Sequence, residues 1–303
     1  MNVIINLFIH PDTGELRSGW QVTIFFMVFL IVAWFIAVPF ATLGTTLLPA
    51  QLQSRWVALT LNKIGMLLAA LAATLFCRNL FPQIQFTRCG YSLSQGWWMD
   101  IVGGSLAGIG LLSLVLGLTV IVQKATLQVV TVSLIPLGLA LIQGLALFLV
   151  AAAFEEVLLR GFAFQTLKEN TNPLNTLLVT SGLFALIHIA NPHSTSLALL
   201  NTFLAGIWLG VARLKRPSLW LATGLHLGWN FATVWLWGIS VSGLDHLIST
   251  TVLATQPLSP QWLTGGSYGP EGGILCTFGL CLATFWMAFR LKPVDPPAHP
   301  SPS

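Results

Sequence analysis

Charged residues are scarce in this sequence. Only 7% of its 303 residues are Asp, Glu, Lys or Arg, against roughly 25% in an average soluble domain. Hydrophobic residues make up 55% of the chain, and the mean hydropathy is strongly positive. This balance excludes an ordinary soluble globular protein and indicates a chain that is embedded in a membrane.

Several other features are also absent. The N-terminus lacks the order of basic, apolar and small residues that marks a cleaved signal peptide, so we expect the first segment to be retained. The four cysteines, Cys77, Cys89, Cys276 and Cys281, show no metal-ligand spacing. We therefore assign them no chemistry, and the chain shows neither a fixed-period repeat nor a soluble domain of any size.

Long apolar runs dominate what remains. Eight of them approach the length of about 20 residues that crosses a bilayer as a helix. They lie at 20–43, 56–76, 101–122, 129–154, 173–190, 196–213, 218–239 and 273–291. We expect an all-α polytopic membrane protein with about eight transmembrane helices. Residues 1–19 would form an N-terminal segment, 20–292 one membrane domain and 293–303 a disordered tail.

The basic residues predict the orientation of these helices. Cytoplasmic loops are enriched in Lys and Arg, and a cytoplasmic N-terminus places most of the thirteen basic residues on the inner side. Both termini are therefore expected in the cytoplasm. The net charge of +4 would suggest nucleic acid as a partner of a soluble protein, but here it follows from membrane orientation, and we expect no nucleic-acid partner.

Three pairs of glycines four residues apart occur within the predicted helices. They are Gly104–Gly108, Gly206–Gly210 and Gly224–Gly228. This spacing allows two helix backbones to approach closely. The third pair brackets His226, so close packing and a polar side chain are expected to coincide there.

Two adjacent carboxylates interrupt the fourth apolar run. Glu155 and Glu156 lie in the stretch AAAFEEVLLRGF, and an ionisable residue inside a membrane segment is by default a candidate functional site. Residues four apart share a helix face, so Glu156 and Arg160 can neutralise each other. Glu155 points to a face about 100° away, and it needs a partner from another helix.

Two histidines within predicted spans are the candidate partners. His188 lies on the fifth predicted helix, one turn after Phe184. His226 lies on the seventh, one turn before Asn230. Because residues four apart share a helix face, each helix offers a short polar edge.

The turn at 170–173 predicts the relative depth of these residues. It is equally distant along the chain from Glu155 and His188, so an antiparallel hairpin brings the two to one level. His226 shares this level only if 160–170 extends well toward the cytoplasm and the fifth and sixth helices end early on the outer side. We favour that arrangement because the segment GFAFQTLKEN is amphipathic enough to lie at or beyond the interface.

These residue types suit hydrolysis of an acyl bond. A carboxylate beside a neutral imidazole can hold and deprotonate a water molecule, and a second histidine with a nearby amide supplies donors for an oxyanion. Glu155, His188 and His226 also have the right chemistry for an open zinc site, although the HExxH spacing is absent. The alternative for either histidine alone is a hydrogen bond between helices.

Three motifs resemble those of the CPBP family, which comprises the type II CAAX prenyl endopeptidases, the bacteriocin-processing and self-immunity proteins, and the Abi proteins. They are EExxxR at 155–160, FxxxH at 184–188 and HxxxN at 226–230, in this order on three predicted membrane helices. The opening HPDTGELRSGW is also similar to the start of bacterial members. The resemblance implies an intramembrane endopeptidase that opens toward the cytoplasm, in the cell membrane of a bacterium.

The resemblance also implies a role for each matched residue. Glu155 would activate water with the help of His188, while His226 and Asn230 would stabilise the oxyanion. The remaining charged residues of the first motif, Glu156 and Arg160, would orient the helix of the first glutamate.

Cofactor and substrate stay open at this point. Members of the family have been described both as metalloproteases and as metal-free glutamate proteases, so we assign no cofactor and keep one zinc ion at Glu155, His188 and His226 as the alternative. The expected partners are the lipid bilayer and a peptide or protein substrate at the membrane. That substrate is a prenylated CAAX-type C-terminus, a bacteriocin leader or a membrane protein.

Two other classes of function are alternatives. A transporter or channel could use the same glutamate and histidines as a proton or ion relay. Transporters usually repeat broken helices in matching positions of both halves, whereas here the polar elements occur only in the second half. A non-enzymatic scaffold or immunity protein could instead keep the motifs and act by binding.

Overall fold

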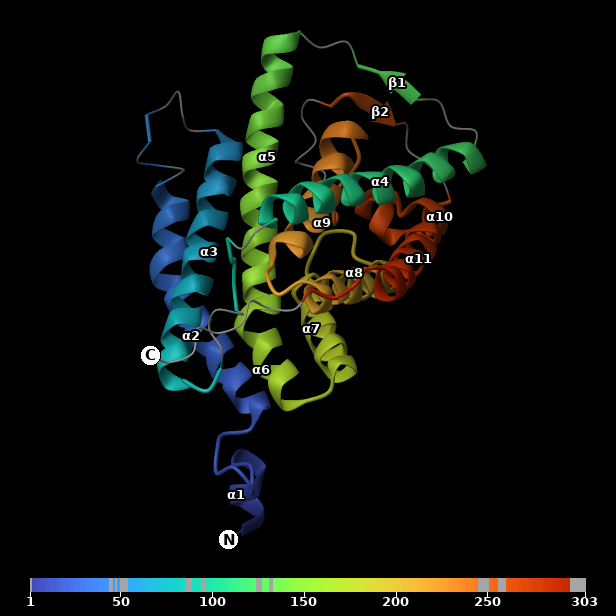
Figure 1. The fold of residues 1–303 in the computed structure, drawn as a ribbon. Helices are drawn as coiled ribbons and strands as arrows, with labels where there is room; N and C mark the ends of the chain where they lie inside the picture. Colours follow the sequence, from blue (N-terminus) through green and yellow to red (C-terminus); the bar gives the residue numbers. More distant parts are fainter. Residues whose placement is uncertain are drawn as a thin grey trace.

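Helices form nearly all of the computed structural model (Figure 1), which describes residues 2–43, 46, 48–49, 54–84, 89–93, 96–123, 127–130, 133–244, 251–255 and 260–294. The α-helices are α1 (Asn2–Phe8), α2 (Ser18–Thr42), α3 (Arg55–Leu80), α4 (Trp97–Gln123), α5 (Leu134–Glu156), α6 (Phe162–Asn170), α7 (Pro173–Ile187), α8 (Ser196–Lys215), α9 (Trp220–Phe231), α10 (Gln261–Thr264) and α11 (Ile274–Arg290). Two π-helical turns, η4 (Val157–Gly161) and η5 (Ala232–Leu236), continue α5 and α9. The predicted all-α class is confirmed.

Other secondary structure is minor. Two short 3₁₀ turns, η7 (Gly266–Tyr268) and η8 (Pro270–Gly272), precede α11. Within the described ranges, the one pair of strands is an antiparallel ribbon of β1 (Leu127–Val129) and β2 (Leu253–Thr255). The ribbon joins the segment after α4 to the segment after α9.

Each predicted apolar run coincides with a helix. Within the described residues, five helices are long and apolar enough to cross a membrane: α2, α3, α4, α8 and the continuous rod Leu134–Asn170 that α5, η4 and α6 form together. The apolar helices α7 and α11 are shorter, and α9 has only 12 residues before η5 extends it. The chain is therefore a multi-pass membrane protein, with fewer full-length spans than the eight predicted.

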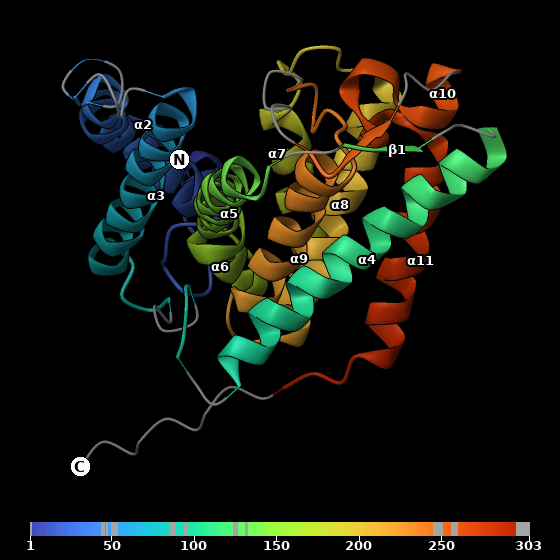
Figure 2. The same ribbon diagram turned by 90° about the horizontal axis from the view of Figure 1, so that it is seen from above.

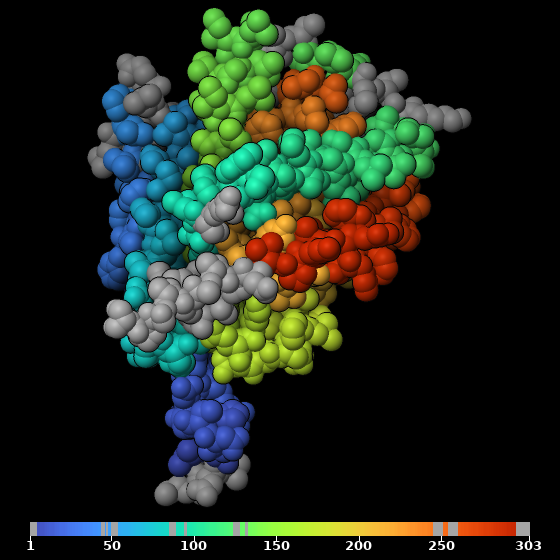
Figure 3. Space-filling model, viewed as in Figure 1, coloured from blue at the N-terminus to red at the C-terminus, as the bar shows by residue number. Residues whose placement is uncertain are grey.

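The helices pack in two groups around the long rod (Figures 1 and 2). Helices α2 and α3 lie side by side along one flank of α5, while α7, α8, α9 and α11 gather on its other flank. The space-filling view shows α4 and α11 crossing the face of this second group (Figure 3). Large apolar side chains such as Trp34, Phe35 and Ile121 point outward, as expected where lipid replaces water.

Glycines hold α9 directly against α4. A Cβ atom at Gly108 would overlap the carbonyl oxygen of Leu225, and one at Gly228 would overlap the carbonyl oxygen of Ser105. Gly104 meets the backbone of α9 in the same way, with its Cβ position 2.7 Å from the carbonyl oxygen of Leu221. The close approach predicted from the glycine spacing is confirmed for these two helices, and it fixes the helix that carries His226.

Local capping defines the hairpin between α6 and α7. The side chain of Asn172 accepts a hydrogen bond of 2.8 Å from the backbone of Asn175, and Pro173 occupies the first helical position. Both are preferred at a helix N-terminus, because the cap satisfies a free N–H and proline has none to satisfy. Helix α7 then ends at Ile187, so the early end expected for this helix is present.

The segment after Arg160 packs inside the protein. All residues from Phe162 to Leu167 are buried there, while the expected place of GFAFQTLKEN at or beyond the membrane interface stays a prediction. The ring of Phe162 packs against Phe25 of α2, with centroids 5.2 Å apart. Helix α6 therefore continues the rod of α5 within the protein. Residues 295–303 of the predicted tail lie outside the described part of the chain, and the boundaries at 19 and 292 stay predictions.

Candidate active site

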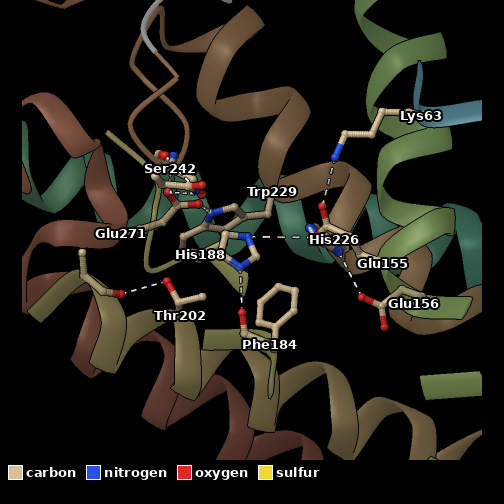
Figure 4. A network of polar contacts seen from close by, with 12 residues as sticks. Lys63, Glu155, Glu156, Phe184, His188, Thr202, His226, Trp229, Ser242 and Glu271 are labelled. Atoms are coloured by element: carbon tan, nitrogen blue, oxygen red, sulfur yellow. Dashed lines mark hydrogen bonds and ion pairs between the residues drawn. The ribbon is translucent and has the colours of Figure 1, made fainter. Parts of the chain in front are cut away.

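Three helices bring the predicted site residues to one cavity. Glu155 comes from α5, His188 directly follows α7, and His226 and Asn230 lie one turn apart on α9. All four line a cavity of about 580 Å³, which Lys63 of α3 also lines. The close-up shows the side chains of Lys63, Glu155, His188 and His226 converging from these separate elements (Figure 4).

Three nitrogen atoms surround the carboxylate of Glu155. Its Oε2 atom lies 3.7 Å from Nε2 of His226 and 4.0 Å from Nε2 of His188, and its Oε1 atom lies 3.6 Å from Nζ of Lys63. These separations exceed hydrogen-bond length. The carboxylate therefore faces both imidazoles across the cavity wall without a direct hydrogen bond to either, and its oxygens stay available to a bound molecule.

The protonated nitrogen of His188 is fixed by the end of α7. The ring nitrogen Nδ1 lies 2.7 Å from the carbonyl oxygen of Phe184. A carbonyl oxygen only accepts hydrogen bonds, so Nδ1 donates and carries the proton. In the neutral ring Nε2 is then an acceptor, and this is the atom that faces Glu155.

Glu156 has a wider role than the sequence indicated. The predicted pair with Arg160 is present, with Oε1 of Glu156 3.3 Å from the guanidinium, and both side chains are fully buried. The same oxygen lies 3.0 Å from Nδ1 of His226. Nδ1 of His226 donates to it, so Glu156 orients the histidine whose other nitrogen faces Glu155.

Arg160 links the first motif to its neighbours. It donates a hydrogen bond of 3.2 Å to the carbonyl oxygen of Gly206 on α8, and its guanidinium lies 4.5 Å from the centroid of the Phe184 ring. Arg213 of α8 in turn donates to the carbonyl oxygen of Arg160 across 3.3 Å. That carbonyl belongs to the π-helical turn η4, a kind of turn frequent at functional sites.

Asn230 is the fourth predicted site residue, and its amide group is available to bind a substrate. It lines the cavity one turn beyond His226, and its amide makes no hydrogen bond within the described part of the chain. An amide N–H held on the cavity wall beside an imidazole is suited to binding a developing negative oxygen. The neighbouring loop also contributes Asn191 to the wall, whose amide donates to the carbonyl oxygen of Ser242 across 3.1 Å.

Lys63 is a site residue that the sequence reasoning missed. Its ammonium faces Glu155 and lies 5.3 Å from the centroid of the Phe154 ring. The available signal was its position inside an apolar run, since charged residues within membrane helices are rare and usually paired.

Glu271 is the second missed residue. It belongs to η8, outside the membrane-spanning helices, and it lines the same cavity as Glu155. Its carboxylate accepts hydrogen bonds from Trp229 and from Ser242. Burial nevertheless raises the pKa of the Glu271 carboxyl group above its ordinary value. Glu271 lies outside the predicted apolar runs, so the sequence gave no signal like the one at Lys63.

The side chains at this site do not form a ready metal centre. Among the described residues, no group of three or more His, Cys, Asp or Glu side chains is arranged to hold a metal ion. The donor types of Glu155, His188 and His226 suit zinc, but the ammonium of Lys63 at 3.6 Å already faces the carboxylate. A divalent cation at Glu155 would meet that positive charge at short range, so these residues as placed do not fit a zinc ion.

Comparison with known proteins identifies the segment that carries this site. Residues 136–232 match the family model described as type II CAAX prenyl endopeptidase Rce1-like. The match includes Glu155, Glu156, Arg160, His188, His226 and Asn230, and leaves Lys63 and Glu271 outside. Neither the curated proteins nor the solved structures contain a significant match to the chain. The segment from residue 136 to residue 232 is thus similar to the Rce1-like type II CAAX prenyl endopeptidase domain, in agreement with the resemblance to the CPBP family.

Proposed function

We propose that this protein is an intramembrane endopeptidase that hydrolyses a peptide bond by attack of a water molecule held at Glu155. The observation that carries the proposal is the placement of Glu155. Its Oε2 atom faces the Nε2 atoms of His188 and His226 at 4.0 and 3.7 Å, and the opposite nitrogen of each ring is fixed by a hydrogen bond.

The first step is addition of water to the scissile carbonyl group. Glu155 takes a proton from the water molecule, which His188 helps to position. The water oxygen forms a bond to the carbonyl carbon, and the electron pair of the carbonyl bond moves to its oxygen. His226 and Asn230 donate hydrogen bonds to that oxyanion, a kind of stabilisation that is often the largest single contribution to catalysis.

The second step breaks the carbon–nitrogen bond. The carboxylic acid formed at Glu155 returns its proton to the departing amine, and the oxyanion collapses to a carboxylic acid product. Glu156 supports both steps, because a carboxylate at Nδ1 of His226 stabilises the ring in the form that donates from Nε2.

We propose that these steps use no bound metal. The support is the position of Lys63, which supplies a positive charge beside Glu155 without occupying the cavity centre. The cation favours the ionised carboxylate that must accept the proton from water. This assignment makes Glu155 the general base of a glutamate-type protease.

The substrate that fits this site is a peptide segment at the membrane. Apolar side chains line much of the cavity, among them Phe29, Met66, Leu147, Phe148, Leu158 and Leu280. We infer that an apolar stretch enters this space, as a prenylated CAAX-type C-terminus, a bacteriocin leader or a membrane protein would provide. The apolar lining does not distinguish among these three substrates.

We also propose that both termini are cytoplasmic and that the protein resides in a bacterial cell membrane. The support comes from the last turns of the helices that run inward in this orientation. They carry Arg78 on α3, Lys168 on α6, Arg213 and Lys215 on α8, and Arg290 on α11. Basic residues favour the cytoplasmic side of a membrane, so the ends of these four helices agree with the proposed orientation.

A comparison of two cell populations tests the activity and identifies the substrate. One produces the wild-type protein and the other the variant Glu155→Ala, and mass spectrometry compares their membrane-associated C-termini and leader peptides. We expect a set of cleaved termini that is present only with the wild type, while the variant Glu15→Gln, changed at an exposed carboxylate, retains it. Full processing by Glu155→Ala would contradict the proposal and favour a scaffold that acts by binding.

A further inference from the structure

The catalytic cavity contains a second carboxylate that the proposed reaction does not use. Glu271 lies across the cavity from Glu155, and the close-up shows His188 between the two (Figure 4). The backbone around Glu271 is held in place, since its carbonyl oxygen accepts a hydrogen bond of 2.7 Å from the amide of Asn201 on α8. The same amide donates to the carbonyl oxygen of Gly273 at 2.9 Å. The carboxylate is therefore presented on a fixed wall.

All of the hydrogen-bond donors to this carboxylate are neutral. Oε1 of Glu271 accepts from the indole N–H of Trp229 at 3.1 Å. Oε2 accepts from the backbone N–H of Ser242 at 2.6 Å and from its hydroxyl group at 3.0 Å. No Lys, Arg or His side chain lies within ion-pair distance of it in the described part of the chain.

The unbalanced charge of Glu271 is costly without a ligand. Burying a carboxylate is strongly unfavourable unless a cation compensates it, which is also why burial raises the pKa of this group. Glu155 in the same cavity has Lys63, and Glu156 has Arg160. Among the described residues, Glu271 alone of these three carboxylates has no Lys or Arg within ion-pair distance, and the basic side chain that acts on it from further away is His188.

The free positions on the carboxylate define the cation that fits. A carboxylate offers about four acceptor positions, and three are filled by Trp229 and Ser242. A guanidinium that binds in bidentate fashion needs a free position on each oxygen, whereas Oε2 already accepts two hydrogen bonds. An ammonium group needs only one acceptor, and Oε1 retains one, while Glu271 is half-buried and lines the cavity.

We propose that Glu271 is a substrate-recognition site that binds the ammonium group of a lysine side chain close to the scissile bond. The proposal rests on the proposed protease function, because it places the lysine of the peptide in the cavity while the scissile carbonyl group lies at Glu155. The lysine side chain would pass His188 and end at Oε1 of Glu271. The protein would thus select a peptide that is apolar except for one lysine.

A positional peptide series tests this proposal with the full-length protein in detergent micelles. Each fluorogenic peptide has an apolar background, with lysine, arginine or the uncharged isostere norleucine at one of three positions on either side of the scissile bond. We expect kcat/KM for lysine to exceed that for norleucine at least tenfold at one position, mainly through KM. Arginine at that position should be cleaved less efficiently than lysine.

The variant Glu271→Gln removes the charge while keeping the size of the side chain. For this variant we expect the ratio of kcat/KM for the lysine peptide to kcat/KM for the norleucine peptide to fall to about one. The control variant Glu15→Gln should keep the wild-type ratio. Ser242→Ala removes one neutral donor and leaves the charge, so it should keep the preference for lysine. Retention of the full lysine preference by Glu271→Gln would overturn the proposal.

The wild-type protein alone also decides the question if Glu271→Gln does not fold. Efficient cleavage of norleucine peptides that depends on Glu155, with no preference for lysine at any position, would reject the lysine site and leave the protease function intact. Failure of the wild type to cleave any peptide, together with unchanged termini in the cell comparison, would reject both proposals.

Discussion

The Nδ1 atom of His226 lies 3.0 Å from Oε1 of Glu156. Glu156 therefore orients His226, and the other ring nitrogen of His226 faces Glu155. Arg160 binds the same oxygen from one turn further along the rod. The first and third sequence motifs are thus joined by one buried oxygen atom, and a change at Glu156 should affect both stability and catalysis.

The variant Glu156→Gln separates these two effects when it is combined with a change at Arg160. The single variant leaves a fully buried guanidinium without its counter-charge, which typically costs about 3–5 kcal/mol. We expect a clear drop in Tm in detergent. The double variant Glu156→Gln, Arg160→Met removes both charges and should recover part of the lost Tm. Activity should stay low in both proteins because His226 lacks its carboxylate, and a double variant with restored activity would contradict this role of Glu156.

Removal of the ammonium beside Glu155 should slow the chemical step. The variant Lys63→Met keeps an unbranched side chain but loses the charge 3.6 Å from the carboxylate. We expect kcat to fall about 100-fold, at the lower end of the range of a general-base contribution, and KM to change less. Lys63→Arg restores the charge and should recover most of the rate, so equal losses in the two variants would show that Lys63 acts through packing alone.

Two glycines on α4 form a matched test of the contact with α9. A Cβ atom at Gly108 would overlap the backbone of Leu225, whereas one at Gly110 meets nothing within 4 Å. Gly108→Ala should cost about 1–3 kcal/mol, as overpacking usually does, and should reduce activity by displacing His226. Gly110→Ala should be neutral or stabilise the helix by up to about 1 kcal/mol. Thermal unfolding of both variants checks the contrast, and equal Tm values would contradict a direct backbone contact.

Metal removal tests the assignment of a glutamate-type reaction. Protein treated with a strong chelator and verified by elemental analysis to be free of zinc should keep its activity on a fluorogenic peptide. The expected reason is that Lys63, rather than a metal ion, supplies the positive charge beside Glu155. Loss of activity that added zinc restores would instead contradict the metal-free reaction and favour a zinc ion with Glu155, His188 and His226 as its candidate ligands.

Local spacing explains why part of the site could be predicted from the sequence. The pair of Glu156 and Arg160 depends only on helix periodicity. The common level of Glu155 and His188 depends only on equal chain lengths on either side of the hairpin turn. Both relationships are present in the structure, as the distances of 3.3 and 4.0 Å show.

The rest of the site depends on packing between distant segments. Lys63 approaches from α3 and Glu271 from η8, and no periodic pattern relates either residue to the motifs on α5, α7 and α9. Long-range packing also determines the environment of α6. The Oε1 atom of Gln165 accepts a hydrogen bond of 3.2 Å from the buried Arg213 of α8.

The π-helical turn η4 changes the side of the long rod that packs against its neighbours, so α5 and α6 use different faces. Each residue advances a helix by about 100°, so the extra residue in a wide turn changes the angular phase of everything after it. Glu155 faces the reaction cavity before the turn, and α6 packs its buried side against α2 after it. Deleting one residue from 157–159 would swing α6 out of register with α2, and it would also change the spacing by which Arg160 pairs with Glu156. The turn therefore joins a catalytic part of the rod to an anchoring part, and its length determines the angle between them.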